Sequence, residues 1–484
     1  MGEFANWDAK GMDPSKFLVD GEWRSSDSQR EVINPYTRKS VGRVFQASTA
    51  DIDSAIGAAA GSFARMNRLA SYERRDILTR VSHGLEANRK EFAELITAET
   101  GKPISFSKAE VERAIFTFRV AAEESTRLEG EVLPLDMNPA SKGRTALVQR
   151  FPLGPVGAIT PFNFPLNLVA HKLGPAIAAG CPVVLKPSSS APMTALHLGK
   201  IIVEAGLPMG GLNIVPCVAG EAAQLVTDER LKLISFTGSP AVGWDLKAKA
   251  GRKRVVLELG GNAGVIVCED ADIDSAVTKL IPGTFGNAGQ SCISVQRIYI
   301  QESIFDEFTE RFTAATLAVP VGDPNDERTI VGPMIDEAAA KKVEGWIGEA
   351  REHGARVLCG GNRQAAVLEP TLLTDVPLEM KIYCQEAFAP LAILEPFKNL
   401  GEAVDKVNAS SFGLQAAIFT NDARAIFRAY RELEVGGVIV NDSSAYRMDH
   451  MPYGGVKQSG FGREGVRYAI EEMTELKLLA LNVP

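Results

Sequence analysis

The sequence predicts an α/β protein built around a doubly wound parallel sheet, with a second α/β region after it. The chain has 484 residues, which corresponds to about three compact units. From Gly154 onward, short β-branched runs alternate with helical segments, the order expected of right-handed strand–helix–strand crossovers. Ligands of such sheets bind beyond the carboxyl ends of the strands, so the loops that follow strands are the informative ones.

Composition excludes several classes of protein. Hydrophobic residues make up 45% and charged residues 23% of the chain, as in an ordinary soluble globular protein. The net charge is −8 and no basic block occurs, so a nucleic-acid partner is not expected. The longest apolar stretch, 166–185, contains His171 and Lys172, which argues against a membrane span. The six cysteines are scattered without a C-x-x-C pair, which predicts neither a metal site nor disulfides, but reduced thiols in a cytoplasmic protein.

The first third of the chain is predicted to be mostly helical. The start, Met1–Gly11, has no apolar segment and is expected to be a loose tail rather than a secretory signal. Helical spacing runs over 51–127 after an N-cap at Ser48 or Thr49, and 74–95 is a second amphipathic segment within it. Around 134–150 the pattern becomes a loop followed by an exposed, alternating strand.

The alternating part of the chain gives the sheet and its crossovers. Strands are predicted at 156–160, 182–186, 212–216, 231–236 and 255–259, with helices at 166–179, 194–204 and 221–226. The second α/β region, 272–449, has helices at 272–280, 305–317 and 338–353 and strands at 297–300 and near Val357 and Ile393. The last segment, 476–484, has β character, and such an edge commonly pairs with another chain.

Three features of the sequence could carry chemistry: a turn after a strand, a loop cysteine and a strand-end carboxylate. The turn from Gly238 to Gly243 opens a helix whose free N–H groups favour a phosphate, although it lacks the Lys-Ser/Thr of a P-loop. Cys292 lies in a glycine-punctuated loop, a context that favours a reactive thiol over a small buried hydrophobe. Glu258 ends an apolar strand; it is either a carboxylate facing water or a general base whose pKa is raised by apolar surroundings.

Six motifs in order resemble the aldehyde dehydrogenase superfamily, over nearly the whole chain from about Phe17. They are Pro161-Phe162-Asn163-Phe164-Pro165, Phe236-Thr237-Gly238-Ser239, Glu258-Leu259-Gly260-Gly261, Gly289-Gln290-Ser291-Cys292, Glu386-Ala387-Phe388-Ala389-Pro390 and the segment from Pro452 to Gly460. The resemblance implies oxidation of an aldehyde to its carboxylate with NADP or NAD.

The resemblance also assigns catalytic roles. Cys292 would form a thiohemiacetal and then a thioester, because a planar carbonyl cannot expel hydride. The Asn163 amide and the backbone N–H of Cys292 would stabilise the oxyanion. Glu258 would activate the water that hydrolyses the thioester, and Lys172 and Glu464 match positions linked to proton movement around that base. For Lys172, a solvated helix lysine is the alternative interpretation.

The family analogy places the cofactor along the post-strand loops. Lys186 would lie near the adenosine ribose, Ser239 at the pyrophosphate, and Glu386 at the nicotinamide ribose with Phe388 beside it. Many NAD-preferring relatives carry Glu at position 189, so Ser189 predicts that NADP is accepted. The other cofactor-binding residues implied by the motifs are Thr160, Pro161, Phe162, Asn163, Ser188, Gly238, Gly243 and Leu259.

For the substrate, the resemblance indicates a small, anionic or hydroxylated aldehyde. Phe164 and Ser291 are the candidate contacts beside the nucleophile, and Ser291 stands where relatives that handle phosphorylated aldehydes carry arginine. Arg113 and Arg447 lie on segments that line the substrate tunnel in relatives. They either bind a carboxylate or sulfonate or form surface salt bridges.

Two rival functions remain open at this stage. A dehydrogenase that transfers the acyl group to coenzyme A would not need an activated water, so Glu258 favours hydrolysis. A non-catalytic binding or structural member of the fold would lack at least one of Asn163, Glu258 and Cys292.

By the same analogy we expect three units: a dinucleotide-binding domain (1–129 and 153–260), a catalytic domain (261–453), and a β bridging element for oligomerisation (130–152 and 454–484). A homodimer or homotetramer is the expected assembly.

Overall fold

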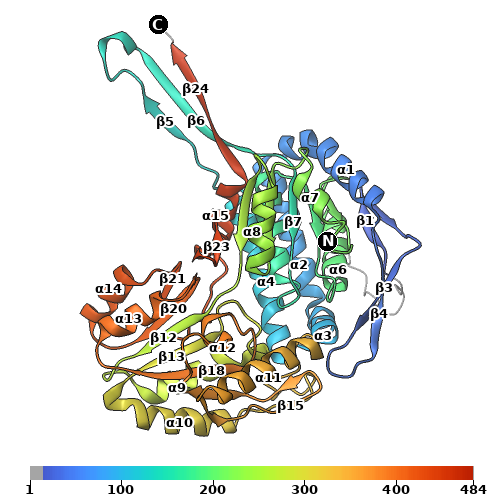
Figure 1. Cartoon of the computed structure of the whole chain (residues 1–484). Helices are drawn as coiled ribbons and strands as arrows, with labels where there is room; N and C mark the ends of the chain where they lie inside the picture. Colours follow the sequence, from blue (N-terminus) through green and yellow to red (C-terminus); the bar gives the residue numbers. More distant parts are fainter. Residues whose placement is uncertain (1–14, 483–484) are drawn as a thin grey trace.

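A computed structural model describes residues 15–482, and the predicted tail Met1–Gly11 lies outside these described residues. Two sheets, each covered by helices, lie one above the other in Figure 1, and a three-stranded arm projects away from both. The α/β class and the doubly wound parallel sheet predicted from the sequence are confirmed.

The first sheet has eight strands in the order β2-β1-β9-β8-β7-β10-β11-β23. Its parallel centre consists of β9 (Leu212–Ile214), β8 (Val183–Lys186), β7 (Val156–Ile159), β10 (Leu233–Thr237) and β11 (Arg254–Glu258). The edges β1 (Phe17–Val19), β2 (Glu22–Arg24) and β23 (Gly460–Phe461) are antiparallel. The chain runs outward from β7 in one direction and returns through β10 in the other, so the topological switch point lies between β7 and β10.

The predicted helical stretch 51–127 is four helices rather than one or two. They are α1 (Thr49–Arg68), α2 (Ser71–Ala87), α3 (Arg89–Thr100) and α4 (Ile104–Glu124), and Ser48 caps α1 in a capping box with Asp51. Helix α5 (Asn167–Ala179) follows β7 and is buried along its whole length, because it packs against α2, α4 and α15 (Val466–Glu472). The remaining crossover helices are α6 (Met193–Glu204), α7 (Ala223–Thr227) and α8 (Pro240–Lys249).

The second sheet has seven strands in the order β14-β17-β18-β13-β12-β20-β21. They are β14 (Arg356–Cys359), β17 (Thr371–Thr374), β18 (Leu391–Phe397), β13 (Val295–Gln301), β12 (Ala263–Val267), β20 (Gln415–Phe419) and β21 (Gly437–Val440). Its helices are α9 (Ile273–Phe285), α10 (Phe305–Leu317), α11 (Glu337–Glu352), α12 (Lys381–Cys384), α13 (Leu400–Asn408) and α14 (Ala423–Glu432). Sequence reading missed β12, β17, β20 and β21. Strand β12 follows β11 after four residues with no helix between them, so the strand–helix alternation that reveals the first sheet is absent there.

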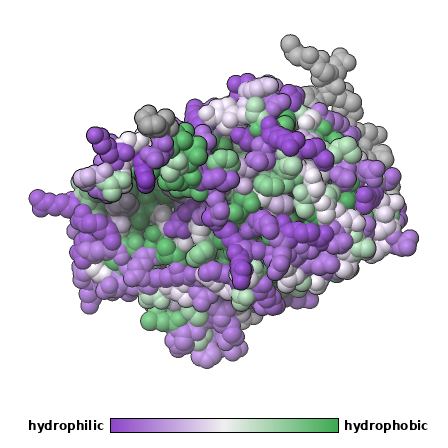
Figure 2. Space-filling model, turned by 90° about the horizontal axis from the view of Figure 1, so that it is seen from above, coloured by the Kyte–Doolittle hydropathy of each residue, from purple (hydrophilic) through white to green (hydrophobic). Residues whose placement is uncertain are grey.

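The arm consists of β5 (Glu131–Pro134), β6 (Arg144–Pro152) and the C-terminal strand β24 (Thr474–Asn482), paired antiparallel in the order β24-β6-β5. Figure 2, which views the molecule from above, shows hydrophobic side chains exposed among hydrophilic ones on the face toward the arm. The exposed apolar residues of the arm are Val132, Met137, Leu147, Leu476, Leu478 and Leu479.

Within residues 15–482, no helix is long and apolar enough to cross a membrane. The same residues contain no cluster of His, Cys, Asp or Glu side chains that could hold a metal ion.

Candidate active site

A cavity of about 700 Å³ lies where the carboxyl ends of β7, β10 and β11 face the second sheet. Fourteen of the residues predicted from the sequence line it: Arg113, Pro161, Phe162, Asn163, Phe164, Gly238, Ser239, Glu258, Leu259, Ser291, Cys292, Glu386, Phe388 and Arg447. The others, Thr160, Lys172, Lys186, Ser188, Ser189, Gly243 and Glu464, lie outside the lining. The topological switch point of the first sheet therefore opens into this cavity.

Cys292 is presented by a loop with a left-handed backbone. Asn287 and Ala288 have φ of +53° and Gly289 has φ of +66°, a conformation that is costly for the two residues with a side chain. The Cys292 thiol is half-buried, and its Sγ lies 3.0 Å from the Tyr453 hydroxyl. Burial raises the pKa of Cys292 to about 12, and the hydrogen bond with Tyr453 opposes that rise.

The segment 259–262 carries the chain from β11 to β12 directly behind the nucleophile. A Cβ at Gly261 would collide with the carbonyl of Cys292, and one at Gly260 would collide with the Glu386 carboxylate. Gly261 is therefore required by the close approach of the Cys292 backbone, whereas a side chain at position 260 would displace the Glu386 carboxylate. Glu386 accepts a hydrogen bond from the Gly261 N–H at 2.8 Å, and burial raises the pKa of its carboxyl to about 7.

The loop that carries Asn163 is fixed by a buried ion pair from helix α4 and the turn before it. Glu110 accepts hydrogen bonds from the N–H groups of Leu166 and Asn167 at 2.9 and 3.1 Å, at the start of α5, and is itself paired with buried Lys102. The Asn163 Nδ2 donates to the Gln290 carbonyl at 3.0 Å, which ties the amide to the nucleophile loop. Its second N–H has no recorded acceptor within residues 15–482, so it remains available to an incoming oxygen.

Two buried carboxylates near the cavity are in opposite situations. Both oxygens of Glu258 lack a hydrogen-bond partner among the described residues, and burial followed by repulsion from Glu464 holds its pKa well above the usual range. Glu464 accepts from Lys172 at 3.3 Å and from Arg447 at 3.1 Å. These two cations outweigh its burial and lower the pKa of Glu464 to about 2. Such a pair, with pKa values pushed apart, is typical of acid–base chemistry.

Lys172 is 1% exposed, so it is not the solvated helix lysine that remained possible from the sequence. Its ammonium donates to the Ser235 hydroxyl at 2.9 Å and to Glu464 at 3.3 Å, and burial lowers its pKa. The lysine therefore holds Glu464 in place from the side away from the cavity.

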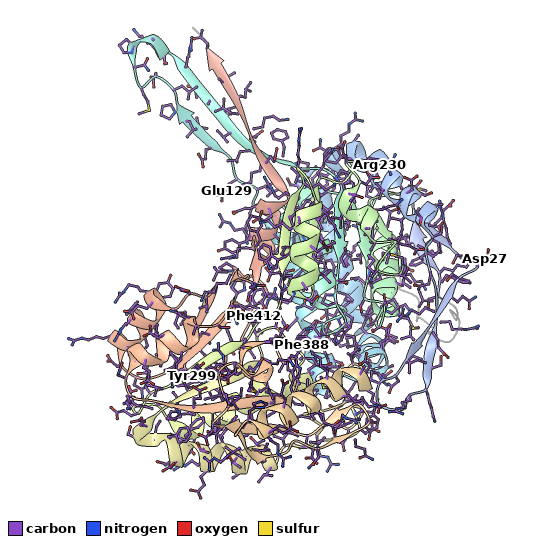
Figure 3. All side chains as sticks on the ribbon, viewed as in Figure 1. Asp27, Glu129, Arg230, Tyr299, Phe388 and Phe412 are labelled. Carbon is purple, nitrogen blue, oxygen red and sulfur yellow. The ribbon has the colours of Figure 1, made fainter. Side chains whose placement is uncertain are left out.

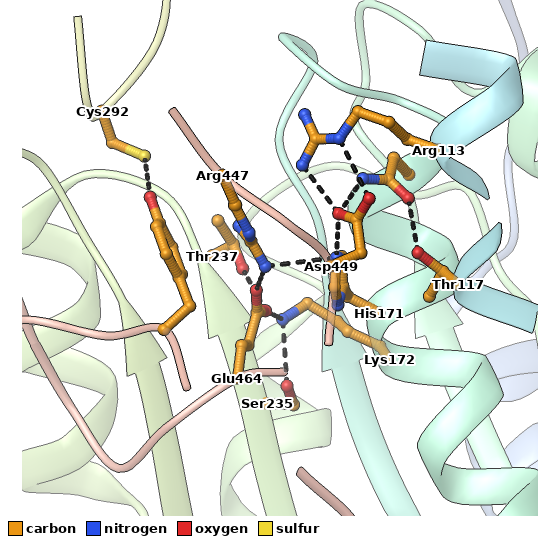
Figure 4. A network of polar contacts seen from close by, with 12 residues as sticks. Arg113, Thr117, His171, Lys172, Ser235, Thr237, Cys292, Arg447, Asp449 and Glu464 are labelled. Atoms are coloured by element: carbon orange, nitrogen blue, oxygen red, sulfur yellow. Dashed lines mark hydrogen bonds and ion pairs between the residues drawn. The ribbon is translucent and has the colours of Figure 1, made fainter. Parts of the chain in front are cut away.

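The two candidate substrate arginines are held by carboxylates, as Figure 4 shows. Arg113 makes a bidentate pair with buried Asp449, at 3.1 Å from Nε and 2.7 Å from Nη2. Arg447 uses Nη2 for Glu464 and for the His171 ring at 3.2 Å, and its guanidinium lies 3.6 Å from the centre of the Tyr453 ring. The side chain of Arg447 is 6% exposed, so it is not a surface salt-bridge partner. Each arginine keeps an Nη1 without a hydrogen bond to the described part of the chain.

The cofactor-side residues form a second group at the same edge of the sheet. Gly243, in the first turn of α8, packs on Leu259, and a Cβ there would collide with the leucine. Lys186, at the end of β8, has its ammonium 3.3 Å from the Ser189 hydroxyl. Phe388 lies between the two sheets (Figure 3), in edge-to-face contact with Phe162 at 6.1 Å.

Sequence reasoning missed several residues of this site. His171 and Asp449 are joined at 2.8 Å and connect Arg113 to Arg447. Tyr453 lies in the last of the six motifs, but the sequence assigned it no role. The one signal for His171 was its place, with Lys172, in an otherwise apolar helix. Asp449 carries no local signal, because its partners come from α4 and α5.

Comparison with known proteins gives consistent matches over nearly the whole chain. A family model described as the aldehyde dehydrogenase family matches residues 23–479. A 3-sulfolactaldehyde dehydrogenase of Priestia megaterium is 45% identical over 466 residues, 96% of this chain and 97% of the relative. A lactaldehyde dehydrogenase of Methanocaldococcus jannaschii is 41% identical over 472 residues, 96% of this chain and 100% of the relative.

Solved structures agree with these matches. Aldehyde dehydrogenase 21 from Physcomitrella patens, in complex with its reaction product succinate, has a TM-score of 0.96 and 46% identity, and the match covers 97% of this chain and 99% of that one. Glyceraldehyde-3-phosphate dehydrogenase GapN from Methanocaldococcus jannaschii, complexed with NADP, has a TM-score of 0.91 and 40% identity, with 95% and 100% covered.

Proposed function

The chain belongs to the aldehyde dehydrogenase family and is an NAD(P)-dependent oxidoreductase, and we propose that it oxidises a small anionic aldehyde to its carboxylate through a thioester on Cys292. One observation carries the proposal: a thiol, an amide with a spare N–H and a carboxyl without partners all face a single cavity. These are the three groups that nucleophilic attack, oxyanion stabilisation and thioester hydrolysis require.

The proposed reaction begins at Cys292. Its thiolate sulfur attacks the aldehyde carbon and forms a thiohemiacetal, whose oxyanion accepts from the free Asn163 N–H and from the backbone N–H of Cys292. A nicotinamide held in the cavity would supply the hydride acceptor, and loss of hydride from the thiohemiacetal carbon would leave a thioester on Cys292.

Glu258 then removes a proton from a water that attacks the thioester carbon, and the acid product leaves as the thiolate re-forms. Because its oxygens have no fixed partners, Glu258 is free to bind that water. Lys172 and Glu464 hold charge beside it and would pass the proton onward.

The residues present fit a dinucleotide. The helix α8 begins at Pro240 after Ser239, whose side chain makes no cap hydrogen bond, so the first N–H groups of the helix are left for a pyrophosphate. At the end of the site where the adenosine ribose would bind, the Lys186 ammonium lies beside the Ser189 hydroxyl, and position 189 carries no carboxylate. Burial is the main cause that lowers the pKa of Lys186. The positive charge of Arg30, on the nearby strand β3 (Gln29–Ile33), lowers that pKa further. This cationic environment suits a 2′-phosphate, and we propose that NADP is the preferred cofactor.

The charges on the cavity wall favour an anionic substrate. Arg113 and Arg447 line the cavity, and each keeps an Nη1 without a hydrogen bond to the described part of the chain. A carboxylate or sulfonate on the substrate would accept hydrogen bonds from those Nη1 atoms. The names of the relatives that act on sulfolactaldehyde and lactaldehyde are consistent with such a substrate.

The decisive experiment is a panel of aldehydes scored by cofactor reduction. Sulfolactaldehyde, succinic semialdehyde and lactaldehyde are compared with a neutral aldehyde of equal length, each with NADP and NAD. The proposal expects the highest kcat/KM for the anionic members with NADP. Equal kcat/KM for neutral and anionic members would contradict the anionic substrate, and a strong NAD preference would contradict the role of Ser189.

The same assay separates the two rival functions. Coenzyme A is added to one arm, and the product is identified as the free acid or the thioester. An acyl-coenzyme A product would show that the acyl group is transferred to coenzyme A instead of being hydrolysed. If no aldehyde led to cofactor reduction, a non-catalytic member of the fold would be favoured.

We also propose that the protein is a cytoplasmic homodimer or homotetramer. The exposed apolar side chains and the open backbone edges of the arm support assembly, because a partner subunit would cover them. The division into a cofactor domain, a catalytic domain and a bridging element belongs to the same proposal. In that division, β23 belongs by its residue numbers to the bridging element (454–484), but it pairs with β11 of the cofactor domain.

A further inference from the structure

Tyr453 has a fixed position beside the thiol and has no role in the reaction described so far. The residue is 3% exposed, and its backbone pairs with that of Glu464 in both directions, at 3.0 and 2.6 Å. Its ring packs in a small apolar cluster with Ile293, Leu414 and Met451. The backbone bonds and the packing leave the hydroxyl little freedom to move away from Sγ, 3.0 Å distant.

The direction of this hydrogen bond depends on the state of the sulfur. With a neutral thiol, either group can donate. With a thiolate, only the tyrosine hydroxyl can donate, and a hydrogen bond to an ionised acceptor is stronger than one between neutral groups. Burial holds the pKa of Tyr453 well above its usual range, so the hydroxyl keeps its proton and does not act as a base. The contact therefore favours the thiolate over the thiol.

A cation lies on the face of the same ring. The Arg447 guanidinium is 3.6 Å from the ring centre and is held there by Glu464 and His171. A positive charge at the ring face draws electron density from the phenol and makes its O–H a better donor. Among the other charged groups that face the thiol, Glu386 and Glu258 oppose ionisation of Cys292, and Arg447 favours it directly.

We propose that Tyr453 is a catalytic residue whose hydroxyl donates a hydrogen bond to the Cys292 thiolate, and that Arg447 strengthens this donor through the ring. The tyrosine moves no proton of its own; the thiol proton leaves to solvent, and the hydrogen bond stabilises the sulfur anion that remains. This inference rests on the proposed role of Cys292 as nucleophile. It adds a link between the wall that would bind the substrate anion and the reactivity of the sulfur.

The test measures the reactivity of Cys292 without aldehyde or cofactor. The rate of alkylation by iodoacetamide is followed between pH 7 and 9 in a Cys384→Ser background, because Cys384 is the exposed cysteine among the described residues, and the modified peptide is identified by mass spectrometry. Tyr453→Phe keeps the ring and removes the donor. Loss of a charge-assisted hydrogen bond raises a pKa by about one unit, and the more basic thiolate is intrinsically more nucleophilic, so alkylation should slow about three- to fivefold. Tyr430→Phe, on the surface of α14, is the matched control.

Strengthening the donor should have the opposite effect. Incorporation of 3-fluorotyrosine at position 453 makes the phenol more acidic without changing its contacts, and alkylation should become faster than in the unmodified protein. A purely structural tyrosine would not produce opposite changes for removal and strengthening. The proposal would be overturned if the Tyr453→Phe variant were alkylated as fast as the unmodified protein, or faster. It would also be overturned if 3-fluorotyrosine at position 453 did not accelerate alkylation.

The contribution of Arg447 is measured by coupling. Arg447→Met should slow the alkylation of Cys292. The slowing should be smaller in the Tyr453→Phe background, because the part of the Arg447 effect that acts through the hydroxyl is already lost there. Equal effects in both backgrounds would limit Arg447 to its direct influence on the sulfur and overturn that half of the proposal. If Cys292→Ala retained full turnover, the proposed function itself would fail, whereas a failure confined to alkylation would remove only the role of Tyr453.

Discussion

The two walls of the cavity differ in how their polar groups are satisfied. On one wall, which we call the reacting wall (Asn163, Glu258 and Cys292), the Glu258 oxygens and one Asn163 N–H have no partner within the described structure. On the other, which we call the charged wall, Arg113 and Arg447 line the cavity and His171, Asp449 and Glu464 lie behind them. Each of these five side chains makes at least two polar contacts, although His171 Nδ1 and Arg447 Nε have no partner within the described structure.

The contrast has a chemical reason. A group that must bind a water or an oxyanion during turnover cannot be tied to a permanent partner, and burying it unpaired costs free energy. A group that sets the local potential must stay in place, and pairing keeps it there. The following predictions test this division, in order of decreasing effect.

Removing the sulfur from the reacting wall should have the largest effect. Cys292→Ala should lower kcat by about 10⁴-fold or more, because no other group can form the thioester. The loss is measured by cofactor reduction, with thermal unfolding to show that the fold is retained. Cys384→Ala, at an exposed cysteine, should keep full activity. Brisk oxidation by Cys292→Ala would exclude covalent catalysis at this site.

Removing the base should affect only the second half of the reaction. Glu258→Gln should lower steady-state kcat by about 10²- to 10⁴-fold, yet retain a first-turnover burst of reduced cofactor, because the thioester forms but is not hydrolysed. Rapid mixing with excess aldehyde measures the burst. Loss of the burst together with kcat would mean that Glu258 is needed before the thioester forms.

Changing the charged wall should alter binding more than chemistry. Arg447→Met should raise KM for an anionic aldehyde about 10- to 100-fold, the value of one charge-assisted hydrogen bond, and leave KM for a neutral aldehyde nearly unchanged. Arg119→Met, at an exposed position of the same helix as Arg113, is the control. Unchanged KM for semialdehydes would remove Arg447 from the substrate site.

The smallest effect is a shift in pH dependence. Glu258 must be deprotonated to act as a base, and repulsion from Glu464 raises its pKa, second only to burial. Glu464→Gln removes that repulsion, so the pKa of Glu258 should fall and the acidic limb of the kcat profile should move to lower pH by about one unit. An acidic limb that stays in place or moves upward would show that Glu464 does not set the charge on Glu258.

Much of the fold could be predicted because its signals are local. The strand–helix alternation after Gly154 depends on neighbouring residues, and β7, α5 and β8 begin and end within a residue or two of the predicted bounds. Strand β12 escaped prediction although it is no more buried than β8 and β10, because it follows β11 after four residues without an intervening helix. The division of the long helical stretch into α1–α4 was likewise not visible from periodicity alone.

The candidate site divides in the same way. Short motifs were enough to place Cys292, Glu258 and Asn163 in the candidate site, because each lies in a loop or at a strand end whose neighbouring residue types are distinctive. The charged wall depended on contacts between distant segments: Arg113 and Asp449 pair across 336 residues of chain, and His171 and Arg447 across 276. Residue types and loop positions follow from the chain itself, whereas the partner of each buried charge is chosen only when the elements pack. That choice decides which carboxyl is ionised, because a pKa is determined by the charges and the burial around the group.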